Sequence, residues 1–158
     1  MPFLNKYLVL LAICSSVMFS SCQQSSQCGT VTTKATESEV VTLEQWLNTN
    51  GISATKDSRG FFYKIVKAGT NDNPNTCNTV RVAYSGSLTD GTEFEYNSNT
   101  TLNMAQLIKG WQQALPLIGS GGQIKIFLPP SLAYGSTPKP NIPANSILIF
   151  DIELKDVL

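Results

Sequence analysis

The side chains able to do chemistry in this chain are few, and their spacing offers no reactive pair. The sequence has no histidine, which excludes the common Ser-His-Asp and Cys-His nucleophile systems and histidine-based zinc sites. The four cysteines, at positions 14, 22, 28 and 77, lack the C-x-x-C spacing of a zinc ribbon or a redox motif. The glycine-rich stretch 119–122 lacks the lysine and the helix start of a phosphate-binding loop. We therefore expect neither a metal nor a cofactor.

Two acidic pairs and a set of aromatic residues are the remaining candidates. Asp151 and Glu153 alternate with apolar neighbours along one predicted strand, and Glu93 and Glu95 do so along another. Carboxylates in such an alternation belong on the solvent face of a strand. The aromatic residues are Tyr84, Phe94, Trp111, Tyr134 and Phe150. Each of them alone is best explained as a core residue, so any chemistry must come from an apolar pocket with a few hydrogen bonds.

Composition sets further bounds on the chain. Its 158 residues leave room for one domain plus processing segments. The formal net charge is zero and only 14% of the residues are charged, so we expect no nucleic-acid partner.

Residues 1–21 predict a secretory signal peptide. Lys6 is the only charged residue among the first 33, and the apolar run 7–19 is followed by two serines and Cys22. The run has 13 residues, too few to cross a bilayer, which takes about 20. The serines and Cys22 resemble a bacterial lipobox with Cys22 as the lipidated residue; ordinary cleavage beside an unmodified Cys22 is the alternative. We expect an exported lipoprotein of the cell envelope, periplasmic or associated with the outer membrane, held on a membrane by acyl chains.

Residues 22–37 predict a flexible tether between this anchor and the folded part. The stretch is rich in Gln, Ser and Thr and poor in apolar residues, a composition that does not support a core. With Cys22 acylated, Cys28 and Cys77 are left. An exported compartment permits a disulfide between them, but two unpaired thiols, or a buried Cys77, fit the sequence equally well.

Residues 38–59 predict a helix and hairpin extension ahead of the main domain. Ser38 can cap the helix, and Asn50-Gly51 can end it. The apolar face of this helix contains Val40, Leu43, Trp46 and Leu47. Residues 52–56 and 61–67, separated by a polar turn, then predict a hairpin.

From residue 60 onward the pattern is one of strands with a single short helix. Alternation predicts strands at 80–85, 92–96, 123–128 and 147–154. Residues 108–115 predict the helix, which Pro116 ends. This order favours an α+β fold in which an antiparallel sheet curls around the helix.

Four motifs within residues 60–158 resemble those of the FKBP-type peptidyl-prolyl isomerases. Residues 82–95, VAYSGSLTDGTEFE, are similar to the family pattern V-x-Y-x-G-x-L-x-D-G-x-x-F-D. Residues 107–111, LIKGW, are similar to V-I-x-G-W, and residues 126–135 to I-P-x-x-L-A-Y-G. Residues 142–154 resemble the closing pattern I-P-x-x-x-x-L-x-F-x-V-E-L. The motifs occur in the family order, and residues 38–67 are similar to the N-terminal extension of bacterial members.

The resemblance implies a fold, a site and an activity. The fold would be a five- or six-stranded antiparallel sheet half-wrapped around a short helix, with an apolar cleft between them. The cleft would have Trp111 as its floor and Tyr84, Phe94, Leu107, Ile108, Ile142 and Phe150 as its walls. The Tyr134 hydroxyl and the Ile108 backbone N–H would supply hydrogen bonds at the rim, and Glu95 would bond to Tyr84. The protein would be a monomeric isomerase that acts on proline-containing polypeptide clients without a metal or a cofactor.

The sequence departs from the family pattern around the cleft. Glu95 stands where the pattern usually has Asp, and Leu102 stands near the place of a usual aromatic residue. Leu107 replaces the first Val of its motif, and the loop 136–141 is one residue shorter than usual. These changes favour a weaker activity or an altered preference for the residue before proline. A binding or chaperone module of an envelope complex that uses the same groove without catalysis is the alternative function.

Overall fold

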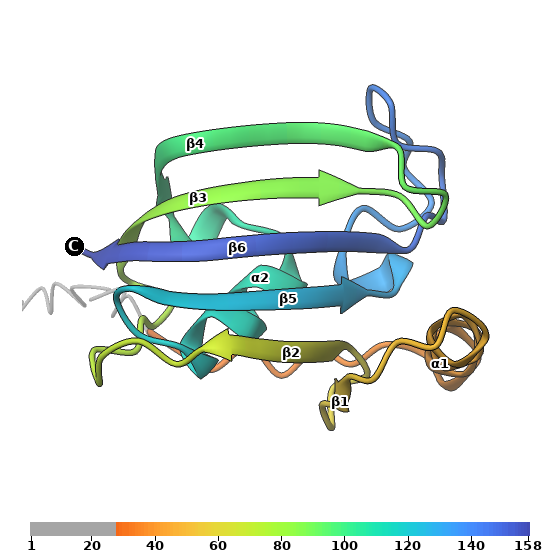
Figure 1. The fold of residues 1–158 in the computed structure, drawn as a ribbon, viewed down its shortest axis with the longest axis horizontal. Coiled ribbons are helices and arrows are strands. Elements are labelled where there is room, and N and C mark those ends of the chain that lie inside the picture. The colour runs from red at the N-terminus through yellow and green to blue at the C-terminus, as the bar shows by residue number, and fades with distance from the viewer. Residues whose placement is uncertain (1–27) are drawn as a thin grey trace, which may run out of the picture.

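The computed structural model of the protein describes residues 28–158. The predicted signal peptide and Cys22 lie outside the described residues. The main feature is one six-stranded antiparallel sheet with the strand order β1-β2-β5-β6-β3-β4 (Figure 1). Its strands are β1 (Thr55–Lys56), β2 (Phe62–Lys67), β3 (Thr79–Ser87), β4 (Glu93–Asn103), β5 (Gly122–Leu128) and β6 (Leu148–Val157). The long strands β3 and β6 pair along nearly their whole length at the centre.

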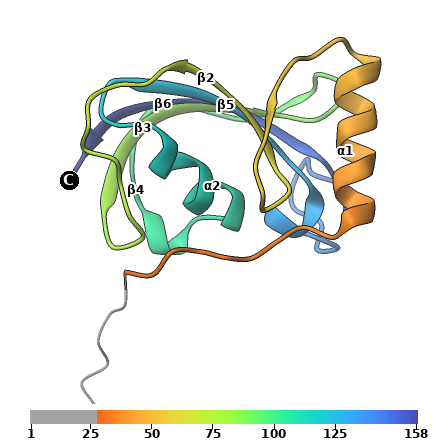
Figure 2. The same cartoon turned by 90° about the horizontal axis from the view of Figure 1, so that it is seen from below.

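The sheet curves around one short helix, α2 (Lys109–Ala114), and the second helix, α1 (Glu37–Thr49), stands apart at the end of the sheet (Figure 2). Single turns of 3-10 helix flank α2: η1 (Met104–Gln106) before it and η2 (Leu115–Leu117) after it. A third such turn, η3 (Pro130–Leu132), follows β5. The predicted α+β class, with an antiparallel sheet around a short helix, is confirmed. Within residues 28–158, no helix combines the length and the apolar character that a membrane crossing requires.

Two hydrophobic clusters use opposite faces of β5 and β6. Alternate residues face α2 in the cross-strand pairs Ile124–Ile152, Ile126–Phe150 and Leu128–Leu148. Because successive side chains of a strand point to opposite faces, the intervening Phe127 and Ile149 face away from this main core. They pack with Val40, Leu43 and Leu47 of α1 in the second cluster. The predicted apolar face of the N-terminal helix is therefore buried against the end of the sheet.

The N-cap residue of α1 differs from the predicted one. Thr36, rather than Ser38, is the N-cap residue. The Thr36 side chain accepts a hydrogen bond from the Glu39 N–H at 3.4 Å, and the Glu39 carboxylate accepts one from the Thr36 N–H at 3.2 Å. Thr-x-x-Glu is the spacing of a capping box, in which both partners satisfy otherwise unpaired backbone donors. This reciprocal pair is possible at Thr36, and it determines where the helix begins.

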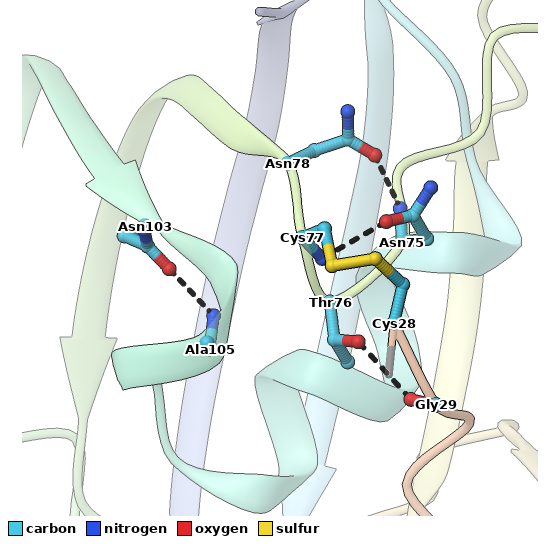
Figure 3. Close-up of a disulfide and its surroundings, with 8 residues drawn as sticks. All are labelled: Cys28, Gly29, Asn75, Thr76, Cys77, Asn78, Asn103 and Ala105. Atoms are coloured by element: carbon cyan, nitrogen blue, oxygen red, sulfur yellow. Dashed lines mark hydrogen bonds between the residues drawn. A yellow bond between two sulfur atoms is a disulfide. The ribbon is translucent and has the colours of Figure 1, made fainter. Parts of the chain in front are cut away.

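Residues 28–35, called the strap below, are bound to the domain, so the predicted flexible tether is wrong for this part. Cys28 forms a disulfide with Cys77, with 5.2 Å between the Cα atoms (Figure 3). Beside it, the Thr76 hydroxyl donates to the Gly29 carbonyl at 3.1 Å. Asn75 shapes the turn around Cys77 by accepting from the Cys77 N–H at 2.9 Å. The pairing of the two cysteines, which the sequence leaves open, is thus present.

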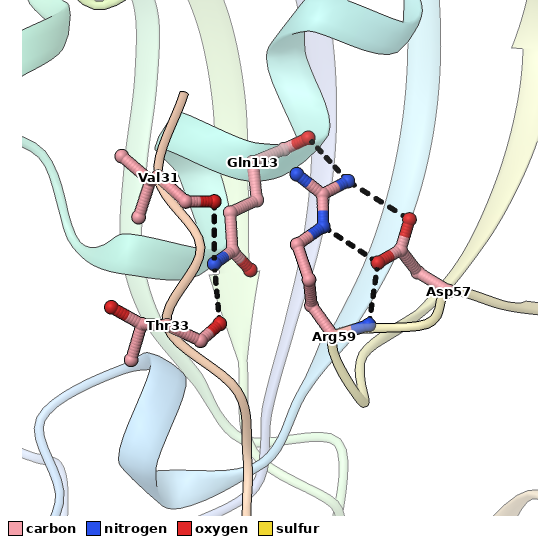
Figure 4. Close-up of polar contacts among 5 residues, drawn as sticks. All are labelled: Val31, Thr33, Asp57, Arg59 and Gln113. Carbon is pink, nitrogen blue, oxygen red and sulfur yellow. Dashed lines mark hydrogen bonds and ion pairs between the residues drawn. The ribbon is translucent and has the colours of Figure 1, made fainter. Parts of the chain in front are cut away.

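A buried glutamine of α2 holds the middle of the strap. The Gln113 side-chain amide donates to the Thr33 carbonyl at 2.7 Å and to the Val31 carbonyl at 3.4 Å (Figure 4). Arg59, which is paired with Asp57, donates to the backbone carbonyl of Gln113 at 3.3 Å. These partners are distant in sequence, and the polar composition of the strap gives no sign of them.

Candidate active site

A cavity of about 210 Å³ lies between α2, η1 and the concave face of the sheet. Its lining is mostly apolar and aromatic: Tyr84, Glu95, Leu102, Gln106, Leu107, Ile108, Trp111, Tyr134 and Phe150. A larger and shallower hollow of about 360 Å³ lies over β3, β5 and β6, where residues such as Ala83 and Ser85 line it. The smaller cavity is the better candidate, because an apolar concave site with a few polar groups is the usual form of a binding pocket.

Trp111, in the first turn of α2, lines this cavity and is only 4% exposed. The Tyr84 ring meets the indole edge-on, with 5.0 Å between ring centroids and an 88° interplanar angle. The Phe150 ring does the same from β6, at 5.3 Å and 86°. Phe94 packs edge-on behind Phe150 at 5.6 Å. Edge-to-face pairs are a favourable aromatic geometry, so the four rings fix one another.

Gly86 of β3 makes room for these rings. It lies opposite Phe150 in the β3–β6 register and opposite Glu95 in the β3–β4 register. A Cβ atom at this position would lie 2.6 Å from the Phe94 ring and 2.9 Å from the Phe150 ring. Gly110 has a similar role in α2, because a Cβ there would overlap the Leu128 side chain of β5. Both glycines of the sequence motifs thus allow an aromatic wall and a helix to approach the sheet closely.

Tyr84 and Glu95 form the polar contact at the cleft. The Tyr84 hydroxyl donates to Glu95 Oε1 at 2.6 Å. Burial, together with the hydrogen bond to Glu95 and its charge, raises the pKa of the Tyr84 phenol above its usual value. The Glu95 side chain, which is one methylene longer than the Asp of the family pattern, therefore reaches the Tyr84 hydroxyl.

Tyr134 follows the proline-rich turn at η3 and lines the cavity with a half-buried ring. Burial and the nearby charge of Glu95 raise the pKa of its phenol. The turn is closed by a hydrogen bond of 2.8 Å from the Gly135 N–H to the Pro130 carbonyl. Glu39 of α1 accepts from the Ser131 N–H at 3.1 Å and also bonds to the Ser131 hydroxyl. The N-terminal helix thus helps to hold the turn that carries Tyr134.

The model of the family described as FKBP-type peptidyl-prolyl cis-trans isomerase matches residues 70–155. The chain belongs to this family. The match covers β3 to β5, most of β6 and all of the cavity-lining residues of this FKBP.

Two relatives give the scale of the similarity. The FKBP-type peptidyl-prolyl cis-trans isomerase FkpA of Escherichia coli K12 is 41% identical over 119 residues, which are 72% of this chain and 43% of FkpA. FkpA of Buchnera aphidicola from Schizaphis graminum is 43% identical over 120 residues, which are 73% of this chain and 47% of that protein. The FKBP chain thus spans less than half the length of these relatives.

Solved structures agree on the fold. The crystal structure of FkpA from E. coli superposes with a TM-score of 0.69 at 35% identity, over 76% of this chain and 59% of that one. A peptidyl-prolyl cis-trans isomerase from Pseudomonas syringae pv. tomato superposes with a TM-score of 0.67 at 24% identity, over 78% and 96% of the two chains. The second likeness is one of fold alone.

The structure brings seven of the nine predicted site residues of this FKBP to the cavity wall. The two others lie behind it. Phe94 supports Phe150 from the rear, and Ile142 is 6% exposed within the main core. Ile142 instead forms two backbone hydrogen bonds of 3.0 Å with Lys139, which close the loop beside Tyr134.

Two lining residues are absent from the predicted site. Leu102, at the end of β4, and Gln106, in η1, both reach the cavity. A nearby departure from the family pattern pointed to Leu102, but nothing in the residue type or spacing of Gln106 gives a signal. The 3-10 turn η1 brings Gln106 to the wall, and such single turns leave little periodic trace in a sequence.

Proposed function

We propose that this protein is a peptidyl-prolyl cis-trans isomerase that rotates X-Pro amides in its apolar cleft. The observation that carries the proposal is the Trp111 floor, surrounded by edge-on rings, in a member of the FKBP family. The cavity lining contains no cysteine, serine or lysine, its one carboxylate, Glu95, is hydrogen-bonded by Tyr84, and the raised pKa values of its two tyrosines keep both phenols protonated, so the lining suits a reaction that needs no covalent step.

The reaction is a rotation about one amide bond. Resonance holds the amide planar with a barrier of about 18–20 kcal/mol, and exchange without a catalyst takes tens of seconds or more. Resonance is lost in the twisted transition state, where the carbonyl oxygen carries less negative charge. A dry, apolar site disfavours the polar planar amide relative to the twisted one. Burial of the proline ring against Trp111 contributes about 2 kcal/mol to binding.

Two hydrogen-bond donors would hold the substrate. The Tyr134 hydroxyl and the Ile108 backbone N–H can each donate to a carbonyl of the bound peptide. Ile108 lines the cavity, and its N–H has no acceptor among residues 28–158. These bonds accelerate the reaction only if they strengthen as the amide twists. Tyr84, with Glu95 behind its hydroxyl, would keep one wall rigid.

An exchange measurement on an Ala-Leu-Pro-Phe peptide tests the activity. Wild-type protein at micromolar concentration should speed cis/trans exchange of the peptide, as observed by NMR exchange spectroscopy. Trp111→Leu should lower kcat/KM by about tenfold, because it removes roughly 1.4 kcal/mol of apolar contact in the cleft. The matched control is Trp46→Leu in α1, since Trp46 packs against the second cluster and does not line the cavity. Peptide binding by the wild type without faster exchange would leave the binding or chaperone module as the function.

We further propose that the protein is an exported monomer, anchored by a lipid on Cys22 after removal of residues 1–21. The support is the single basic residue Lys6 ahead of the apolar run and the small residues before Cys22. Its clients would be exported polypeptides with accessible X-Pro bonds. Metabolic palmitate labelling followed by membrane fractionation tests the anchor. Cys22→Ser should lose the label and Cys14→Ser should keep it, whereas label retained in Cys22→Ser would refute the assignment.

A further inference from the structure

Two adjacent glutamines of α2 are almost fully buried and point to different parts of the fold. Gln112 is 5% exposed and Gln113 is 1% exposed. A buried amide needs hydrogen-bond partners, because an unsatisfied polar group costs about 1–3 kcal/mol. Gln113 donates to the strap, as Figure 4 shows. Gln112 donates to the backbone of the segment that forms the cleft wall. The Gln112 side chain itself does not line the cavity.

The contact of Gln112 is with two backbone carbonyls just ahead of its own helix. Its Nε2 donates to the Leu107 carbonyl at 2.6 Å and to the Ala105 carbonyl at 3.2 Å. The three residues that follow Ala105, namely Gln106, Leu107 and Ile108, all line the cavity. One side chain thus holds the backbone of this short wall segment at two points, one just before it and one within it.

The bond to Leu107 also orients the neighbouring backbone donor. The Leu107 carbonyl and the Ile108 N–H belong to the same peptide unit, which is planar and trans. The two groups therefore point in opposite directions, and fixing one fixes the other. With the carbonyl held by the buried Gln112 amide, the Ile108 N–H points away from that amide. It has no acceptor within residues 28–158.

The other contacts here hold the groups on either side of this peptide unit: the Ile108 carbonyl accepts from the Trp111 and Gln112 N–H groups at 3.0 and 3.2 Å, and the Leu107 and Ile108 side chains pack against the main core. Ile108 is the N-cap residue of α2, and the helix has no side-chain cap. The Leu107 N–H makes a hydrogen bond of 3.3 Å, long for its type, to the Met104 carbonyl. Asn103 caps η1 further back, through the Ala105 N–H at 2.9 Å. Among residues 28–158, Gln112 is the only side chain that hydrogen-bonds to the Leu107–Ile108 peptide unit itself.

We propose that Gln112 is a positioning residue for the isomerase: its amide holds the Leu107–Ile108 peptide so that the Ile108 N–H faces the cleft and can bind a substrate carbonyl. This inference rests on the proposed function. Gln112 acts through the backbone and does not touch the substrate. Its removal should weaken the transition-state hydrogen bond more than the apolar binding of the proline ring, so kcat falls more than KM rises.

The variant that tests this role is Gln112→Met, with Gln113→Met as the matched control. Methionine keeps the length and the apolar stem of the side chain but cannot donate a hydrogen bond. Gln112→Met should lower kcat/KM by about tenfold, the equivalent of one hydrogen bond of about 1.4 kcal/mol. Gln113→Met loses an equally buried amide on the same helix and should keep kcat/KM within about twofold. Equal losses in the two variants would mean that general destabilisation is responsible, and would overturn the proposal.

NMR of the wild-type protein supplies a readout that does not require any variant to fold. A scalar coupling across the hydrogen bond should connect Gln112 Nε2 with the Leu107 carbonyl carbon. On titration with the proline peptide, the Ile108 amide proton should move downfield as it gains an acceptor. An absent coupling or an unmoved Ile108 resonance at saturation would overturn the proposal. A wild type that binds the peptide without speeding exchange would instead sink the proposed function, since both resonance tests remain measurable.

Discussion

Glu95→Asp should lower the activity of this protein, although Asp is the residue that the family pattern usually has. Glu95 Oε1 accepts from the Tyr84 hydroxyl at 2.6 Å. Removing one methylene withdraws the carboxylate by about 1.5 Å, which takes the two oxygens to roughly 4 Å, beyond hydrogen-bond range. A hydrogen bond to a charged group contributes about 1.5–3 kcal/mol when buried. Because Glu95 is exposed, we expect about 1 kcal/mol, or about a fivefold loss of kcat/KM.

A double-mutant cycle with Tyr84→Phe measures the contact itself. Phenylalanine keeps the ring edge-on to Trp111 and removes only the hydroxyl. Each single variant and the double variant should lose a similar amount of activity in the NMR exchange assay, because all three lack the same bond. The coupling energy should then be about 1 kcal/mol. Additive losses, or a Glu95→Asp variant as fast as the wild type, would refute the view that this bond keeps the cleft wall in place.

Three further predictions concern stability. Replacing Cys28 and Cys77 by serine should lower the free energy of unfolding by about 4 kcal/mol in urea titration, because the disulfide closes a loop of 49 residues; a loss under 1 kcal/mol would contradict this. Gly86→Ala should destabilise by about 1–3 kcal/mol and also reduce kcat/KM, because its methyl group displaces the rings of Phe94 and Phe150; unchanged peptide affinity would argue against displaced rings. Stability should fall as pH rises above about 10, where the unfolded tyrosines ionise while the raised pKa values of the two cleft tyrosines keep them protonated in the fold; removing the hydroxyl of either one should flatten this fall.

The sheet and the aromatic floor are predictable because local rules and cross-strand rules agree there. Alternation along residues 123–128 and 147–154 specifies which side chains face the core, and the register pairs them directly. Gly86 and Gly110 occupy motif positions because the approach of Phe150 and Leu128 leaves no room for a Cβ. A sequence motif of this kind reflects a packing requirement of the fold, so the motif predicts the same packing in this chain.

The parts that the sequence did not predict depend on contacts between distant residues. The strap is bound by Gln113, which lies 80 positions after Thr33 in the sequence. The residue types of the strap do not indicate this partner. Gln112 similarly looks like an ordinary helix residue until the carbonyls at its side are known. The motif predicts Ile142 in the cleft wall, whereas the structure does not place it among the cavity-lining residues and pairs its backbone with Lys139. Such assignments need the path of the backbone, which single-residue patterns do not contain.

If Cys22 carries the proposed lipid, the strap limits the distance between that lipid and the cleft. With the disulfide in place, the folded domain begins six residues after Cys22, a fully extended reach of about 20 Å. If the disulfide were reduced and the strap released, the domain would begin at Thr36, 14 residues after Cys22, and the reach would grow to about 50 Å. For an anchored enzyme the same bond that stabilises the domain would therefore confine its search for clients to a thin layer above the membrane.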